Sequence, residues 1–210
     1  MSLQVLLADD HQIVRQGLRS LLERAGFEVV GEAIDGREAV LLAAEKHPDV
    51  AILDLAMPAL NGVDAAREML RSSDSLKVIL LTMHTEDPYV LEALRAGVSG
   101  YVLKTQAVDE LAQAIREVAR GAIYLSPDVS RTVVHAYRSK TEMPLDPLSP
   151  RERQVLQLVA EGKSTKEVAA ILGVSVKTAE SHRSRIMSKL DIHETATLVR
   201  YAIRNGIAQA

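Results

Sequence analysis

The chain has 210 residues, of which 47% are hydrophobic and 25% charged, so it is long enough for one large or two modest globular domains. It contains no cysteine, which excludes disulfides, thiolate metal sites and thiol nucleophiles. The N-terminus, MSLQVLLADD, lacks a basic and then apolar leader, and the apolar runs are too short to cross a bilayer, so we expect a cytoplasmic protein without a membrane partner.

Charge is divided unevenly along the chain. Residues 1–124 contain 12 Lys or Arg and 19 Asp or Glu, whereas residues 125–210 contain 13 and 9. An acidic first part and a basic second part indicate two domains, the second with an anionic partner. A solvated basic face would give the same count, so the charge alone does not identify the partner.

Strand-like and helix-like patterns alternate over the first 120 residues. Helical apolar stripes separate the strands, and the first of these stripes stops at Gly26. This alternation predicts an α/β fold, a doubly wound parallel five-stranded sheet of order 2-1-3-4-5. The strands are expected at residues 5–8, 27–32, 50–54, 77–82 and 100–103.

The remainder of the chain shows helical patterns without strands. A helix capped by Ser126 is expected at 126–139, followed by a polar linker with two prolines at 139–147. Ser149 and Ser164 each begin a capping box, Ser175 caps a helix running to Leu190, and 195–205 forms the last helix. We therefore expect domains at 1–122 and 146–210, the second a small all-α bundle, joined by a helix and linker at 123–145.

Carboxylates follow two strands that are neighbours in this sheet order. Asp54 ends the third strand, and Asp9 and Asp10 follow the first. Because open α/β sheets bind ligands at the carboxyl ends of their strands, we expect the three side chains to converge. Three carboxylates in one crevice repel unless a cation holds them, and oxygen ligands favour Mg²⁺.

Two further polar side chains are expected at the same edge. Thr82 ends the fourth strand and Lys104 follows the fifth. Together with the acids they fit phosphoryl transfer to the Asp54 carboxylate, with the metal ion and the lysine neutralising the phosphoryl oxygens. Each residue taken singly has a simpler interpretation: Asp10 as a helix cap, Thr82 as a strand end and Lys104 as a solvated lysine. Their joint placement favours the functional interpretation.

The motifs LLADDHQ, ILDLAMP, LTMH and SGYVLK, in this order between Leu3 and about Arg120, resemble the receiver domains of two-component response regulators. The resemblance implies that Asp54 is the phosphoacceptor. It implies that Asp10, Asp54 and the main-chain carbonyl of Ala56 bind Mg²⁺ directly, with Asp9 acting through water. It further implies that Thr82 and Lys104 hold the phosphoryl group, and that Tyr101 is the aromatic that turns inward when the threonine moves.

Two residues depart from the family pattern. Ala59 stands where a glycine is common, and Ala56 where a larger side chain often lies. The first is expected to stiffen the loop, and the second to alter how fast the phosphoryl group is lost.

The second domain contains a helix, a tight turn and a second helix at 165–172, 173–175 and 176–190. A glycine turn between two short helices is typical of the helix-turn-helix. On the second helix small polar side chains lie between basic ones, which would let the helix enter a DNA groove while cations meet phosphates. A solvated surface helix is the alternative.

The stretch from Leu148 to about Ile207, beginning LSPRERQVLQLVAEGKS, resembles the LuxR-type DNA-binding domain, and its pairing with a receiver resembles the NarL/FixJ class. The resemblance implies that residues 177–189 of the second helix lie in the major groove of double-stranded promoter DNA and that the last helix, 195–205, pairs two subunits. The base-facing candidates are Glu180, Ser181 and Ser184; the phosphate candidates are Lys177, Thr178, Arg183, Arg185 and Lys189; His182 faces DNA or the core. The dimer-helix candidates are Thr195, Leu198, Val199 and Ala202.

We therefore predict a phosphorylation-controlled transcriptional response regulator. A sensor histidine kinase gives Asp54 its phosphoryl group, and a homodimer, formed on DNA or on phosphorylation, binds promoter DNA. The protein is not expected to be a turnover enzyme. A phosphohydrolase of the haloacid dehalogenase type would carry a second aspartate two residues after the nucleophile, where this chain has Ala56. A DNA-binding protein without phosphorylation is the other alternative.

Overall fold

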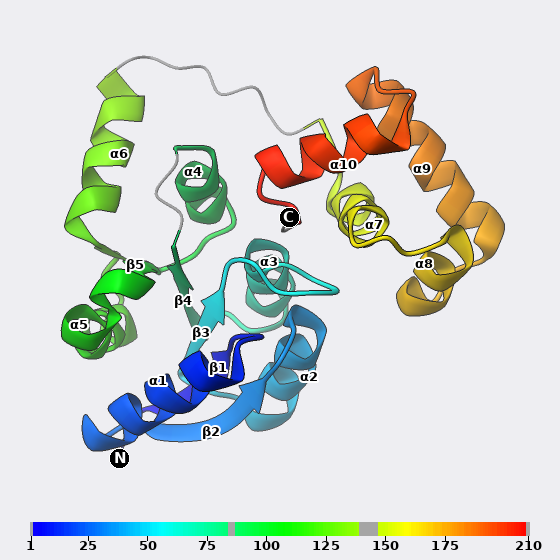
Figure 1. Ribbon diagram of the computed structural model, residues 1–210. Helices are drawn as coiled ribbons and strands as arrows, with labels where there is room; N and C mark the ends of the chain where they lie inside the picture. The colour runs from blue at the N-terminus through cyan, green and yellow to red at the C-terminus, as the bar shows by residue number, and fades with distance from the viewer. Residues whose placement is uncertain (1, 84–86, 139–146, 209–210) are drawn as a thin grey trace. The chain divides into compact units, whose positions relative to one another are not determined.

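The computed structural model describes residues 2–83, 87–138 and 147–208 (Figure 1). The chain forms two compact units, residues 1–141 and 142–210. The linker predicted at 139–147 lies outside the described residues except for its last position.

The first unit contains a parallel sheet of order β2-β1-β3-β4-β5-β6. Its strands are β1 (Gln4–Ala8), β2 (Glu28–Ala33), β3 (Val50–Asp54), β4 (Lys77–Thr82), β5 (Gly100–Leu103) and β6 (Tyr124–Leu125). The predicted fold class and the order of the first five strands are confirmed. The sixth strand was not predicted, because two residues are too short to show an alternating pattern; it pairs with Gly100 and Tyr101 at the edge of the sheet.

Helices cover both faces of the sheet (Figure 1). They are α1 (Gln12–Arg24), α2 (Gly36–Lys46), α3 (Gly62–Ser72), α4 (Asp87–Arg95), α5 (Ala107–Ala119) and α6 (Pro127–Arg138), with a short 3-10 helix η1 (Lys104–Gln106) after β5. Val50 and Ile52 pack with α1 and α5, whereas Ala51 and Leu53 pack with α2, α3 and α4. Successive residues of β3 thus face opposite layers, and the whole strand is buried.

The segment that follows α5 is attached to the edge of the sheet. Helix α6 packs against α4, and Val129 belongs to the same buried core as Tyr101. The buried Ser126 hydroxyl donates to Glu110 Oε2 at 2.9 Å and accepts from the Leu103 main-chain N–H at 3.4 Å. These contacts hold the start of α6 beside the carboxyl end of β5.

The second unit contains four helices within residues 147–208: α7 (Pro150–Ala160), α8 (Thr165–Leu172), α9 (Val176–Leu190) and α10 (Thr195–Arg204). Both predicted capping boxes are confirmed, Ser149 with Glu152 and Ser164 with Glu167. Apolar residues from all four helices, among them Leu156, Val168 and Ile186, share one buried core. In the part of the chain that the structure describes, each helix is too short or too polar to traverse a bilayer.

Candidate functional site

Acidic side chains converge at the carboxyl edge of the sheet. β1 and β3 are hydrogen-bonded neighbours, which brings Asp9 and Asp10 beside Asp54. Ligand atoms of these three residues and of His11 all lie within 4.8 Å of one another. The capping role considered for Asp10 is not seen, because the N-cap of α1 is His11. Instead, His11 Nδ1 lies 2.7 Å from Asp10 Oδ1.

Lys104 reaches the same cluster from η1. Its Nζ lies 2.8 Å from Asp9 Oδ2 and 2.8 Å from Asp54 Oδ2. The side chain of Lys104 is 15% exposed and that of Asp54 5%, so this ion pair is largely shielded from water. One ammonium therefore bridges carboxylates that follow two different strands, as the order of the sheet allows.

Burial and charge set the protonation of this cluster. Burial raises the pKa of Asp54, Lys104 lowers it in part, and the neighbouring Asp9 and Asp10 raise it further, so the net shift is upward. Burial alone would lower the pKa of Lys104, but Asp54 and Asp9 outweigh this effect and the net shift is again upward. The lysine therefore stays charged within the cluster of carboxylates.

Thr82 and Tyr101 lie on one face of the sheet. On β4, Leu80 lies opposite Tyr101 of β5, and Thr82 lies opposite Leu103. Thr82 is therefore two residues after the partner of Tyr101. Side chains two apart on a strand point to the same side. Both residues are buried, and Tyr101 has one of the largest fully buried side chains among those that the structure describes.

The loop between β3 and α3 approaches the Asp54 backbone closely. The Gly62 N–H donates to the Leu55 carbonyl at 2.8 Å. A Cβ at Gly62 would lie 2.2 Å from the Asp54 carbonyl oxygen, so only glycine fits there. Within the loop, the Leu60 N–H donates to the Pro58 carbonyl at 2.7 Å, and Ala59 between them has φ 64°, in the left-handed region.

The donor atoms in this cluster fit a hard divalent cation. Three carboxylates supply oxygen ligands within one 4.8 Å group, and at least two of them can bind an ion that keeps some of its waters. The fit to Mg²⁺ rests on these side chains and not on the His11 nitrogen, a donor that suits transition metals better.

Sequence reasoning missed three residues of this site. His11 follows the acid pair directly, and the sequence gives it no signal apart from its place in the motif. Gly36 and Gly62 lie at the first positions of α2 and α3, where a Cβ would come within 2.0 Å of the Leu60 carbonyl oxygen and 2.2 Å of that of Asp54. A glycine that begins a helix looks like an ordinary helix start, so only the folded structure shows these close approaches.

The second unit contains the predicted helix-turn-helix. Helix α8 ends at Gly173, which has φ 64°, and α9 begins after Ser175, whose hydroxyl accepts from the Thr178 N–H at 3.1 Å. Ala179 and Ile186 fix α9 to the core, which leaves one face of the helix exposed. The exposed candidates on that helix are Lys177, Thr178, Glu180, Ser181, Ser184, Arg185 and Lys189.

Two of the basic candidates are engaged within the domain. Arg183 Nη2 donates to Thr195 Oγ1 at 2.7 Å, and Lys189 Nζ donates to the buried Glu152 Oε2 at 2.7 Å. His182 is half-buried. Among the described residues, none forms a hydrogen bond with its buried Nδ1. Arg183 and Lys189 therefore make contacts within the domain, and a role at DNA for the three side chains stays a prediction.

The expectation that Leu198 and Ala202 form a subunit interface needs correction. Both are fully buried in the core of their own domain, where α10 packs against α7. Thr195 is exposed and Val199 half-buried, so these two of the four predicted residues remain at the surface of α10. A periodic apolar stripe looks the same whether it packs inside a domain or against a second subunit.

Two families match the chain. Residues 5–116 match the family described as "Response regulator receiver domain", and residues 146–202 match "Bacterial regulatory proteins, luxR family". Together the two matched segments include the acid cluster and the helix-turn-helix.

Relatives match over nearly the whole chain. Response regulator UvrY of Escherichia coli (strain K12) is 39% identical over 211 residues, which cover 99% of this chain and 97% of UvrY. Transcriptional regulatory protein LiaR of Bacillus subtilis (strain 168) is 39% identical over 208 residues, which cover 98% of this chain and 99% of LiaR.

A solved structure also matches nearly the whole chain. RcsB from Salmonella enterica serovar Typhimurium, bound to promoter rprA in the presence of the phosphomimetic BeF3-, is 30% identical with a TM-score of 0.65, covering 96% of this chain and 98% of that one. Because both domains match and the relatives extend over almost all of the sequence, the chain belongs to the family of response regulators in which a receiver domain precedes a luxR-type regulatory domain.

Proposed function

We propose that Asp54 of this transcriptional response regulator accepts a phosphoryl group from a phosphohistidine of a sensor histidine kinase. The observation that carries the proposal is the bridge from Lys104 Nζ to Asp9 and Asp54, at 2.8 Å each, within a cluster of three carboxylates. A cation fixed at this point would meet the oxygens of an incoming phosphoryl group.

In the proposed reaction a carboxylate oxygen of Asp54 attacks phosphorus while the bond from phosphorus to the kinase's histidine nitrogen breaks. The product is an acyl phosphate on Asp54 and a neutral histidine on the kinase. Asp9, Asp10, Asp54 and the Ala56 carbonyl would hold Mg²⁺, which supplies neutralising charge to the phosphoryl oxygens. Lys104 and Thr82 would bind the same phosphoryl oxygens.

Turnover is not part of the proposal. An aspartyl phosphatase needs an acid close to its nucleophile to protonate the leaving group. Two residues beyond Asp54 lies Ala56, whose methyl side chain cannot donate a proton. We infer that the acyl phosphate acts as a signal and not as an intermediate in repeated hydrolysis.

The signal would leave the site along β4 and β5. Movement of Thr82 and Lys104 toward the phosphoryl group would shift the carboxyl ends of both strands. Tyr101 lies on the same face of the sheet as Thr82 and would move with it. Val129 of α6 belongs to the same buried core as Tyr101. Ser126 binds the main chain of Leu103, the residue next to Lys104. Helix α6 would therefore respond to phosphorylation, and it leads along the chain to the second domain.

The second domain would bind double-stranded promoter DNA, by analogy with the RcsB protein that was solved bound to promoter rprA. In this proposal the exposed face of α9 would bring Glu180, Ser181 and Ser184 to bases, and Lys177, Thr178 and Arg185 to phosphates. We propose a homodimer on DNA or on phosphorylation, with Thr195 and Val199 at the surface of α10. We propose the limits 1–122, 123–145 and 146–210 for these roles, and a cytoplasmic location, because the protein would meet both promoter DNA and the kinase's phosphohistidine there.

The proposal is tested by a DNA-binding titration at fixed salt with the full-length protein, because salt strongly affects such affinities. Acetyl phosphate and Mg²⁺ should increase the affinity for promoter fragments in the wild type. Asp54→Asn should abolish this increase, whereas the exposed Asp74→Asn should preserve it. An equal increase in Asp54→Asn would contradict the proposal.

A further inference from the structure

Asp9 is held at its side chain and at its main chain. Asp9 Oδ1 accepts from the His11 N–H at 2.8 Å, and Oδ2 lies 2.8 Å from Lys104 Nζ. The Asp9 main-chain carbonyl oxygen makes the third contact: it accepts a hydrogen bond from Arg15 Nη1 at 2.7 Å. This carbonyl belongs to the peptide that joins Asp9 to Asp10.

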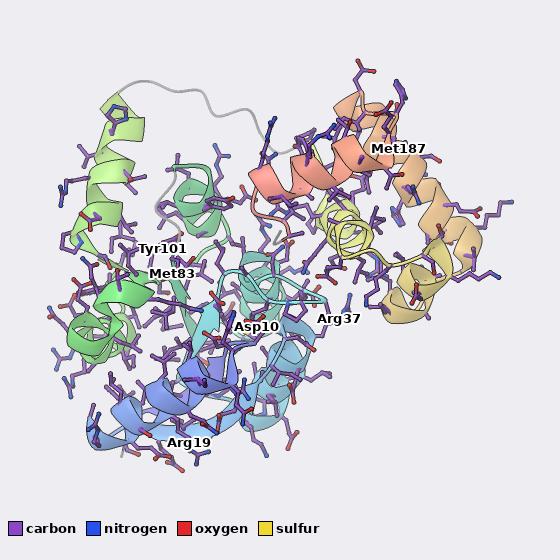
Figure 2. All side chains as sticks on the ribbon, viewed as in Figure 1. Asp10, Arg19, Arg37, Met83, Tyr101 and Met187 are labelled. Carbon is purple, nitrogen blue, oxygen red and sulfur yellow. The ribbon has the colours of Figure 1, made fainter. Side chains whose placement is uncertain are left out.

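Arg15 itself is anchored on its other side. It lies in the first turn of α1, and its side chain is 13% exposed. Its Nε lies 3.4 Å from Glu32 Oε2 on β2, and the other oxygen of Glu32 receives Arg19 Nη1 at 2.6 Å. The guanidinium of Arg15 therefore spans from β2 to the loop that carries the acid pair (Asp10 and Arg19 are labelled in Figure 2).

We propose that Arg15 is a positioning residue for the acid cluster, an inference that rests on the proposed function. Because a peptide is planar, fixing the Asp9 carbonyl oxygen also fixes the direction in which the chain enters Asp10. The Asp10 carboxylate is thereby aimed toward Asp9 and Asp54 before any cation binds. Groups that orient metal ligands in this way typically affect metal affinity by about 10- to 100-fold.

Charge supports the same role. The three carboxylates repel one another, and a guanidinium that donates to the backbone between two of them adds positive charge without occupying a carboxylate oxygen. Lys104, in contrast, takes up one oxygen each of Asp9 and Asp54. Arg15 can therefore favour the ionised cluster while it leaves the ligand oxygens to the metal.

The competing explanation is that Arg15 only ties α1 to β2. Arg19 provides the matched control, because it is on the same helix and pairs with the same Glu32 but makes its other ion pair with Glu23. If Arg15 only ties α1 to β2, loss of either arginine should lower Tm and leave the Kd for Mg²⁺ unchanged. If Arg15 positions the acid cluster, loss of Arg15 should weaken Mg²⁺ binding, whereas loss of Arg19 should not.

The experiment compares wild type, Arg15→Gln, Arg15→Lys and Arg19→Gln as full-length proteins. Isothermal titration calorimetry gives the Kd for Mg²⁺, and thermal unfolding without Mg²⁺ gives Tm. Arg15→Gln should weaken Mg²⁺ binding about tenfold, and Arg19→Gln should leave the Kd unchanged. Since a lysine ammonium cannot span both acceptors as the guanidinium does, Arg15→Lys should give an intermediate Kd.

Three results would overturn the inference. One is a wild-type Kd in Arg15→Gln, even with a lower Tm, because that result describes a structural tie. A second, decisive even if Arg15→Gln does not fold, is a wild-type Kd in Arg15→Lys. The third is a wild type that binds no Mg²⁺, which would remove the metal from the proposed function as well and so is distinguishable from the first two.

Discussion

Lys104 Nζ and Asp54 Oδ2 lie 2.8 Å apart at the carboxyl edge of the sheet, where both side chains are largely buried. Lys104 lies at the same distance from Asp9. The pair joins residues from β3 and from the turn after β5, so it forms only when the strands take their order across the sheet. It also places a positive charge where a phosphorylated Asp54 would carry additional negative charge.

Replacing Lys104 by methionine should lower the rate of phosphoryl acceptance from acetyl phosphate by about a hundredfold, because one donor to the transferring oxygens is lost. Mg²⁺ binding should be kept or strengthened, since the ammonium no longer competes for Asp9 and Asp54. The control is Lys46→Met, which removes an exposed lysine of α2 that pairs with Glu45. Quantitative mass spectrometry measures acceptance, and an unchanged rate in Lys104→Met would contradict the assigned role.

Replacing Ala59 by glycine should raise the free energy of unfolding by about 0.5–1 kcal/mol, because Ala59 has φ 64° and a glycine adopts this conformation without strain. The control is Ala44→Gly on the exposed side of α2, which should lower stability by about 1 kcal/mol. Urea denaturation of both variants checks the opposite signs. Destabilisation by Ala59→Gly would show that the loop does not store this strain.

Replacing Gly62 by alanine should destabilise the receiver by about 2–3 kcal/mol, because the new Cβ would lie 2.2 Å from the Asp54 carbonyl oxygen and the start of α3 would have to shift. Gly17→Ala is the matched control: it is also in a helix, its Cβ would meet nothing within 4 Å, and it should stabilise by about 1 kcal/mol. Thermal unfolding measures both. Equal Tm changes in the two variants would contradict the close approach at Gly62.

The ion pair between Lys189 and Glu152 should make the stability of the helical domain depend on pH. Burial alone would raise the pKa of Glu152, but hydrogen bonds from Lys189 and Ser149 outweigh it and the net pKa is lowered. A lowered carboxyl pKa stabilises the folded domain at neutral pH, and this contribution disappears as pH falls through the folded pKa. Lys189→Met should therefore cost about 1 kcal/mol at neutral pH and less in acid.

Arg185→Met is the control for that prediction. Arg185 is exposed on the same helix, so its loss should leave stability unchanged and weaken DNA binding instead. Hydrogen exchange within α7 of the full-length protein reports the stability of the helical domain. A difference between Lys189→Met and wild type that persists unchanged in acid would remove Glu152 from the explanation.

The third and fourth strands could be predicted closely because each is a largely buried apolar run that ends in a polar side chain, Asp54 and Thr82. The third and fourth strands, 50–54 and 77–82, have the predicted limits. The convergence of Asp9, Asp10 and Asp54 also followed from the sheet order, since neighbouring parallel strands end at one edge. In the second domain, both capping boxes could be recognised from a serine followed three residues later by a glutamate.

What could not be predicted depends on distant parts of the chain. The two-residue β6 forms only because β5 offers its edge for pairing. Arg15 on α1 contacts the carbonyl of Asp9, six residues earlier, and Glu32 on β2, and no local pattern contains either contact. The apolar Leu198 and Ala202 suited a subunit interface as well as a core, and the packing of α10 on α7 shows the core.

Phosphorylation of Asp54 is the claim on which the proposed signalling depends most directly. The decisive measurement incubates the full-length protein with acetyl phosphate and Mg²⁺ and locates the added phosphoryl group by peptide mass spectrometry. We expect one acid-labile addition in the peptide that contains Asp54, dependent on Mg²⁺ and absent from Asp54→Asn. An addition elsewhere in the chain, or equal labelling of Asp54→Asn, would contradict it.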